Sequence, residues 1–170
     1  MKNKFIRIGV PVIILLIVVG IFIVKNLNED KEQQENLKFP YEISKIDLEE
    51  MKSHGLPIII DFGADSCEPC RQIAPILRNL NREMQDKAII QYLDTSKYSS
   101  VAKKYPILYI PTQIFYTADG KPFVPSDELK SDIEFETYSH NDTGEPLYTV
   151  HVGFLSDKQL RTILAEMGVE

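Results

Sequence analysis

The chain has 170 residues, and its 19 Lys and Arg against 25 Asp and Glu give a formal charge of −6. This length fits one modest domain, alone or with an anchor, and a hydrophobic content of 44% is sufficient for a packed core. The acidic balance argues against nucleic-acid binding, which needs a basic surface, and two cysteines exclude a secreted scaffold held by several disulfides.

The first predicted element is an uncharged run of 17 residues at 8–24. As a helix it would be about 26 Å long, near the lower limit for crossing a bilayer. Neither a small-residue cleavage site nor a cysteine for lipid attachment follows it, which favours an uncleaved transmembrane anchor over a cleaved signal peptide. Lys2, Lys4 and Arg7 precede the run and favour a cytoplasmic stub at 1–7, with the rest of the chain on the extracytoplasmic side.

A polar segment of mixed charge follows at 25–38 and is typical of a linker. A first helix of the folded domain is the alternative, because Glu, Gln and Lys are good helix formers. The domain itself is expected at 39–170. Since the three basic residues of the N-terminus lie before the linker, everything from Lys25 onward carries −9.

The domain opens with a predicted helix and a predicted central strand. Ser44–Asp47 has the form of a capping box and predicts a helix at 44–54, before Gly55. The apolar run Leu56–Phe62 indicates a strand covered on both faces, in which Asp61 is the one charge. An acid within such a strand should have a raised pKa, poised near neutrality.

The remaining pattern alternates strands and helices, which predicts an α/β sheet of mixed strand direction. The expected elements are a helix at 67–85 kinked at Pro75, a strand at 88–93, a short helix at 99–105, a strand at 112–116 with a turn at 118–121, and a last helix that begins at the capping box Ser156–Gln159 and stops at Gly168.

An acidic insert at 122–145 does not fit this minimal plan. Residues 133–138 alternate apolar and polar, and turn residues at 141–144 precede a strand at 147–152, so an added antiparallel hairpin is predicted. The insert is either a solvated loop or a partner-docking surface. It contains one lysine and seven acids, namely Asp127, Glu128, Asp132, Glu134, Glu136, Asp142 and Glu145.

Both cysteines fall in one motif, Cys67-Glu68-Pro69-Cys70. At the start of a helix, residues three apart share a face, so two thiols there can form and reopen a disulfide. Cys67 is expected to be the exposed nucleophile, its thiolate stabilised by the helix N-terminus, and Cys70 the resolving thiol. Redox exchange is therefore the leading interpretation.

Two other interpretations of this motif compete with redox exchange. A zinc site needs two more ligands at suitable spacing, but His54, His140 and His151 are scattered along the chain. An inert structural disulfide would close too short a loop to add much stability.

Three motifs in the right order resemble the thioredoxin family. Residues 58–77 look like its active-site stretch, Ile110-Pro111-Thr112 resembles its cis-proline segment, and Val152–Ser156 is similar to its C-terminal end. The resemblance covers about 56–121 and 146–168. It implies a thioredoxin fold, a central mixed β-sheet flanked by helices, here carrying the acidic insert and preceded by the transmembrane helix.

The resemblance also implies roles for individual residues. Catalytic roles fall to Cys67, Cys70, Asp61 and Pro111, with Pro111 in a cis peptide bond facing the cysteines and Asp61 relaying a proton to Cys70. Backbone beside Pro111 would pair with an extended client segment. No cofactor or metal is implied beyond the cysteine pair. The residues expected at the client-binding surface are Ser66, Ile110, Thr112 and Gly153.

Some residues depart from the family pattern. Gly63 and Ser66 replace two tryptophans, which predicts a less apolar surface around Cys67, and Tyr92 replaces the lysine beside the buried acid. The Glu-Pro pair between the cysteines is similar to membrane-anchored reductases that serve cytochrome c maturation. The insert that those proteins carry in the middle of the fold has no counterpart here.

The residues around the motif indicate the direction of electron flow. Glu68 and the overall negative charge oppose formation of the Cys67 thiolate, Arg71 counteracts them locally, and Pro69 is typical of reducing relatives. The prediction is a reductase of protein disulfides that draws electrons from a transmembrane donor protein. The alternatives are a disulfide-forming oxidase, a cytochrome c maturation reductase, and a client-binding or chaperone module in which the thiols are secondary.

Overall fold

The described residues of the protein, in a computed structural model, are 15–22 and 37–169. The chain divides into two units between Leu37 and Lys38, and each is considered by itself. Residues 15–22 form a helix with exposed side chains. Within these two ranges, no helix is both long and apolar enough to span a membrane. Most of the predicted anchor at 8–24, the stub at 1–7 and all but the end of the linker lie outside the described residues.

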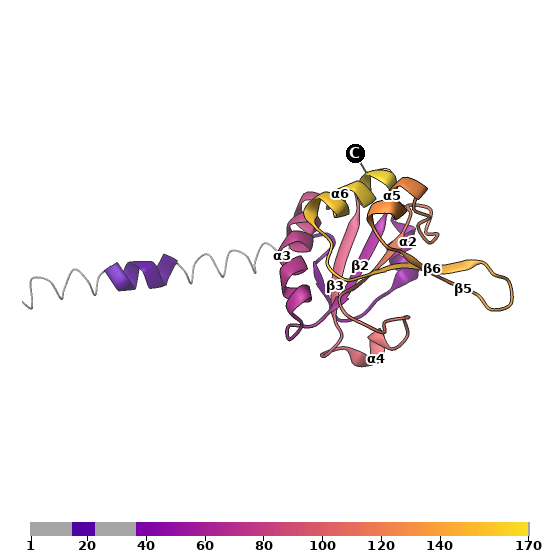
Figure 1. The fold of residues 1–170 in the computed structure, drawn as a ribbon. Helices are drawn as coiled ribbons and strands as arrows, with labels where there is room; N and C mark the ends of the chain where they lie inside the picture. Colours follow the sequence, from indigo (N-terminus) through magenta and orange to yellow (C-terminus); the bar gives the residue numbers. More distant parts are fainter. Residues whose placement is uncertain (1–14, 23–36, 170) are drawn as a thin grey trace, which may run out of the picture. The chain divides into compact units, whose positions relative to one another are not determined.

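A mixed sheet lies at the centre of the second unit (Figure 1). It has six strands in the order β1-β3-β2-β4-β6-β5. Strand β3 runs parallel to β1 and β2, whereas β4 is antiparallel to β2 and β6, and β5 is antiparallel to β6. The predicted mixed sheet is confirmed. The strands are β1 (Glu42–Ile43), β2 (Ile58–Gly63), β3 (Ile89–Asp94), β4 (Thr112–Tyr116), β5 (Glu136–Ser139) and β6 (Pro146–Val152).

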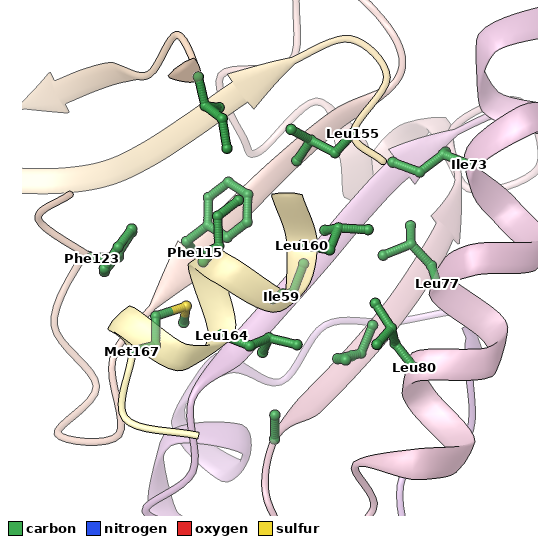
Figure 2. Packing of buried hydrophobic residues seen from close by; sticks show 14 of the residues in the cluster. Ile59, Ile73, Leu77, Leu80, Phe115, Phe123, Leu155, Leu160, Leu164 and Met167 are labelled. Atoms are coloured by element: carbon green, nitrogen blue, oxygen red, sulfur yellow. The ribbon is translucent and has the colours of Figure 1, made fainter. Parts of the chain in front are cut away.

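Helices cover both faces of this sheet, because alternate residues of the central strands point to opposite sides. Ile59 and Phe115 pack with apolar residues of α3 and α6 on one face, as Figure 2 shows. Ile58 and Ile60 pack with residues of α2 and α4 on the other. Every residue of β2 is buried, as the sequence predicts. The helices are α2 (Leu48–Ser53), α3 (Glu68–Glu83), α4 (Ser99–Ala102), α5 (Asp127–Asp132) and α6 (Asp157–Glu166).

Local capping explains which helix boundaries were predicted correctly. At α6 both halves of the capping box are present: the Ser156 hydroxyl accepts from the Gln159 N–H at 3.3 Å, and the Gln159 side chain accepts from the Ser156 N–H at 3.0 Å. The prediction of a capping box at Ser44, with a helix from residue 44, is wrong. Residues just before it pair with β3 as strand β1, and Asp47 caps the helix by accepting from the Glu50 N–H at 3.1 Å.

The acidic insert contains the predicted hairpin and also a helix that was not predicted. Helix α5 is capped by the Ser126 side chain and buries Leu129. The first strand of the hairpin is β5 at 136–139 rather than 133–138, because Ile133 is buried and Phe135 packs against the same core. All seven acids of the insert are exposed.

Candidate redox site

The two cysteines lie at the N-terminus of α3, as the sequence predicts. Cys67 is the N-cap residue and forms a disulfide with Cys70, with the Cα atoms 5.2 Å apart. The Cys70 N–H points at the Cys67 sulfur, 3.4 Å away. Cys67 is half-buried, whereas Cys70 is only 4% exposed. A client disulfide can therefore approach Cys67 but not Cys70.

The proline segment that leads into β4 faces the more exposed cysteine. The Ile110–Pro111 peptide bond is cis, and the Ile110 carbonyl oxygen lies 3.6 Å from the Cys67 sulfur. Ile110 lies just before the β2–β4 ladder, which ends at Thr112. The Thr112 hydroxyl is buried and donates to the Tyr109 carbonyl at 2.7 Å, so it fixes the loop that leads into Pro111.

Gly153 holds this segment from the other side. Its N–H donates to the Pro111 carbonyl at 2.8 Å. Its φ of +120° lies in a region that residues with a Cβ rarely adopt, which explains why glycine occupies this position. The structure thus brings Pro111, Ile110 and Gly153 together beside Cys67, while the client-binding roles assigned to them stay predictions.

The buried acid has the environment expected from the sequence. Asp61 is 1% exposed on β2, and burial raises its pKa to about 7. Tyr92 lies directly opposite it on β3. On the other side, the Gln113 amide of β4 donates to the Asp61 carboxyl at 2.8 Å, and this bond lowers the pKa. Sequence analysis missed Gln113, although a polar residue inside an otherwise apolar strand was a visible signal.

Gly63 brings the β2 backbone close to the disulfide. A Cβ at this position would lie 3.0 Å from the Tyr92 ring and 3.3 Å from the Cys70 sulfur. The Tyr92 ring stacks on Tyr41 at 5.6 Å between centroids, and burial raises the Tyr92 pKa. The space beside Gly63 is therefore closed by Tyr92 and Cys70, so no larger side chain fits here without a shift.

The surface around Cys67 has two contrasting sides. The helix rim, formed by Asp65, Ser66, Glu68 and Arg71, is exposed and polar, with Arg71 paired to Glu68. The cis-proline rim, formed by Leu108, Tyr109, Ile110 and Phe154, is apolar; Leu108 is 78% and Tyr109 71% exposed. The predicted loss of apolar surface holds for the helix rim, but the cis-proline rim supplies apolar side chains from a different segment.

No group of three or more His, Cys, Asp and Glu side chains in the described part of the chain is arranged to hold a metal ion. A hollow of about 220 Å³ lies beside the cis-proline rim, lined by residues of α4, Thr95 and Ile107–Ile110. The site combines a disulfide at the start of α3, the cis-proline rim beside Cys67 and a carboxyl buried on β2, the strand whose Gly63 approaches Cys70.

Comparisons with known proteins agree with this geometry. The sequence model of the thioredoxin family matches residues 48–134, just over half of the chain. Chloroplastic thioredoxin Y of Oryza sativa subsp. japonica is 36% identical over 84 residues, which cover 46% of this chain and 49% of that protein. A thioredoxin of Staphylococcus aureus is 39% identical over 77 residues, covering 42% of this chain and 73% of that protein.

The chain spans about half the length, or less, of the plant thioredoxins Y that it matches. Among solved structures, chloroplastic thioredoxin z superposes with a TM-score of 0.51 at 22% identity, over 75% of this chain and 93% of that one, which supports the fold. The match of the family model and the relative from Staphylococcus aureus show that the chain belongs to the thioredoxin family.

Proposed function

We propose that the protein is a thiol-disulfide oxidoreductase that reduces disulfides in protein clients. Members of the thioredoxin family carry out this exchange with their paired cysteines and need no further cofactor. One observation carries the proposal: the half-exposed Cys67 lies at the N-terminus of α3, bonded to buried Cys70 and 3.6 Å from the carbonyl oxygen of Ile110.

The reduced form would react in two steps. The Cys67 thiolate attacks one sulfur of the client disulfide, and the other client sulfur leaves as a thiolate that takes up a proton. Cys70 then gives its proton to the Asp61 carboxylate and attacks the Cys67 sulfur, which closes the Cys67–Cys70 bond and expels the second client sulfur as a thiolate that takes up the proton from Asp61. The client gains two electrons from the cysteine pair and two protons, one that came from Cys70 and one from the solvent, which had received the Cys67 proton when the thiolate formed.

Reduction of insulin disulfides by the full chain, with dithiothreitol as the electron source, tests this function. Cys67→Ser and Cys70→Ser should each lower turnover to the rate of dithiothreitol alone, and Cys70→Ser should accumulate a mixed disulfide between Cys67 and insulin. Turnover that survives in Cys67→Ser contradicts the proposal. Equal client affinity in the wild type and both variants, without turnover, would instead identify a client-binding module.

The proposed location is the extracytoplasmic face of a membrane, held by the segment at 8–24. Its support is the uncharged apolar run, the three basic residues before it and the polar linker after it. Alkaline carbonate extraction of membranes tests the anchor, and protease added to intact cells tests the side. Release of the chain by carbonate contradicts the anchor, and full protection from protease contradicts the orientation.

The proposed direction is reduction, with electrons from a transmembrane donor protein. Glu68 and the acidic domain disfavour the thiolate and therefore the strongly oxidising type of site. A reduction potential near −270 mV agrees with this, whereas one near −120 mV makes the protein an oxidase. Clients trapped by Cys70→Ser distinguish the alternatives, since apocytochromes c among them would point to cytochrome c maturation.

A further inference from the structure

We infer that Gln113 is a positioning residue for the buried acid: its amide holds the Asp61 carboxyl in place and joins it to the backbone beside the cis-proline. This inference rests on the proposed function, because it concerns the group that accepts the Cys70 proton during client release. On β3, Tyr92 occupies the position beside Asp61 where the family has a lysine. The inference places the polar partner of Asp61 on β4 instead, in the neutral side chain of Gln113.

The two side chains meet across neighbouring strands. Asp61 and Gln113 are register partners in the antiparallel pair β2–β4, and their exposed fractions are 1% and 0%. The Gln113 amide nitrogen lies 2.8 Å from the Asp61 carboxyl oxygen and 3.3 Å from the Gly153 carbonyl oxygen. One buried nitrogen therefore donates to both groups.

These neighbours fix the orientation of the amide. An ionised carboxyl and a backbone carbonyl can only accept, so the nitrogen of Gln113 must face them and not its oxygen. The oxygen is buried and has no hydrogen-bond partner within the described residues. A side chain present only to fill the core would be apolar and would avoid this unpaired atom. The unpaired oxygen indicates that glutamine occupies this position because its amide nitrogen donates hydrogen bonds.

The other groups around Asp61 do not replace this bond. Tyr92 flanks it on β3, and Tyr41 stacks on Tyr92. Cys70 approaches the same sheet face at Gly63, two residues along β2. Arg78 lies over the ring of Tyr41, the outer tyrosine of this cluster, at 5.1 Å from the ring centroid. Because the Gln113 bond favours the ionised carboxyl, its loss should raise the Asp61 pKa further above 7.

The second acceptor of the amide extends the network to the client side. The Gly153 carbonyl accepts a hydrogen bond from the Gln113 amide, and the Gly153 N–H donates to the Pro111 carbonyl at 2.8 Å. Ile110, the residue before Pro111, faces the Cys67 sulfur. Three hydrogen bonds in series, from Asp61 to Gln113, from Gln113 to Gly153 and from Gly153 to Pro111, thus connect the proton acceptor to the backbone on which a client is proposed to pair.

The test compares Gln113→Leu with Gln91→Leu in the full chain. Gln91 is a matched control, since it is also buried in the sheet and donates to a backbone carbonyl, that of Pro40, at 3.1 Å. The pH dependence of insulin reduction is measured from pH 5.5 to 9. The midpoint should rise by about one pH unit in Gln113→Leu, as expected for one lost hydrogen bond to a charged group, and stay in place in Gln91→Leu.

Infrared titration of the Asp61 carboxyl, assigned by subtraction of Asp61→Asn, reports the same midpoint without turnover. In the Asp61→Asn background, Gln113→Leu should cause no additional change in the pH profile. Gln113→Met, close in shape and without the amide, serves where Gln113→Leu does not fold. A carboxyl midpoint unchanged in the folded variant, or shifted equally in Gln91→Leu, overturns the inference. An inactive wild type overturns the proposed function, while the infrared titration still decides the role of Gln113.

Discussion

The helix rim and the cis-proline rim flank the same sulfur atom but differ in chemistry. The helix rim presents charges, among them the exposed pair of Glu68 and Arg71. The cis-proline rim presents Leu108 and Tyr109, two apolar side chains that are 78% and 71% exposed. The contrast teaches that the polar side and the apolar side of Cys67 come from different segments, so changes on the two sides should separate the proposed exchange chemistry from the proposed client recognition.

The largest expected effect of a single change is on the buried acid. Asp61 holds its proton up to about pH 7 in the fold, while a carboxyl of the unfolded chain ionises near 3.9. Between these values the folded state binds more protons, so this group makes the free energy of unfolding fall as pH rises, and the loss levels off above pH 7. Asp61→Asn should therefore be more stable than the wild type at pH 8, by up to about 4 kcal/mol.

Urea unfolding of the full chain at pH 4 and pH 8 measures this difference. The gain should nearly vanish at pH 4, where the carboxyl is protonated in the fold and about half protonated in the unfolded chain. The same variant should slow the release of a trapped client, because Cys70 loses its proton acceptor. An equal difference in stability at both pH values would show that Asp61 does not titrate as described.

The next effect concerns the close approach at Gly63. Gly63→Ala places a methyl group 3.0 Å from the Tyr92 ring and 3.3 Å from the Cys70 sulfur, and should destabilise the fold by about 1–3 kcal/mol. Tyr92→Leu in the same chain should recover part of the loss, since it removes the ring. Urea midpoints of the two single variants and the double variant provide the measurement, and strictly additive effects would contradict the contact.

The sequence predicted what local contacts and short motifs decide. The CxxC pair at a helix start, the capping box at Ser156 and the apolar strand around Asp61 were all readable, because each depends on residues a few positions apart. The start of α2 was not, since two capping residues compete there and a pairing with β3, some 50 residues away along the chain, decides between them.

The rest of the site depends on contacts between distant segments. Gln113 and Asp61 are separated by 52 positions, and only the strand register brings them together. Gly63 and Ser66, where the family has its tryptophans, predict a less apolar surface around Cys67, whereas Leu108 and Tyr109 supply exposed apolar side chains from a separate segment. Helix α5 was not predicted, because its exposed acids are equally typical of a solvated loop. Only the fold shows that Leu129 and Ile133 are buried in the core.

A smaller effect is expected on the cis-proline rim. Leu108→Ser and Tyr109→Ser should each raise KM for insulin about fivefold to tenfold with kcat unchanged, as expected when an apolar side chain that a client would cover is lost. Val124→Ser is the matched control, since Val124 is 72% exposed and lies in the acidic insert. Steady-state kinetics with insulin and with a small disulfide decide. A KM that changes equally for both substrates would mean that the rim does not select protein clients.

The smallest effect is expected on the helix rim. Glu68 lies in the first turn of α3, next to Cys67, and is exposed. Glu68→Gln removes a negative charge that opposes the thiolate and leaves Arg71 unpaired, and both changes stabilise the reduced form. The reduction potential should become less negative by about 10–20 mV, the size expected of an exposed charge at a helix end.

Glu128→Gln, in the first turn of α5, is the matched control and should leave the potential unchanged. Equilibration of the full chain with glutathione buffers measures both variants, and because exposed charges are screened, the shift at Glu68 should shrink as salt is added. A shift that persists in high salt would place the cause in the packing of the α3 N-terminus and not in the charge of Glu68.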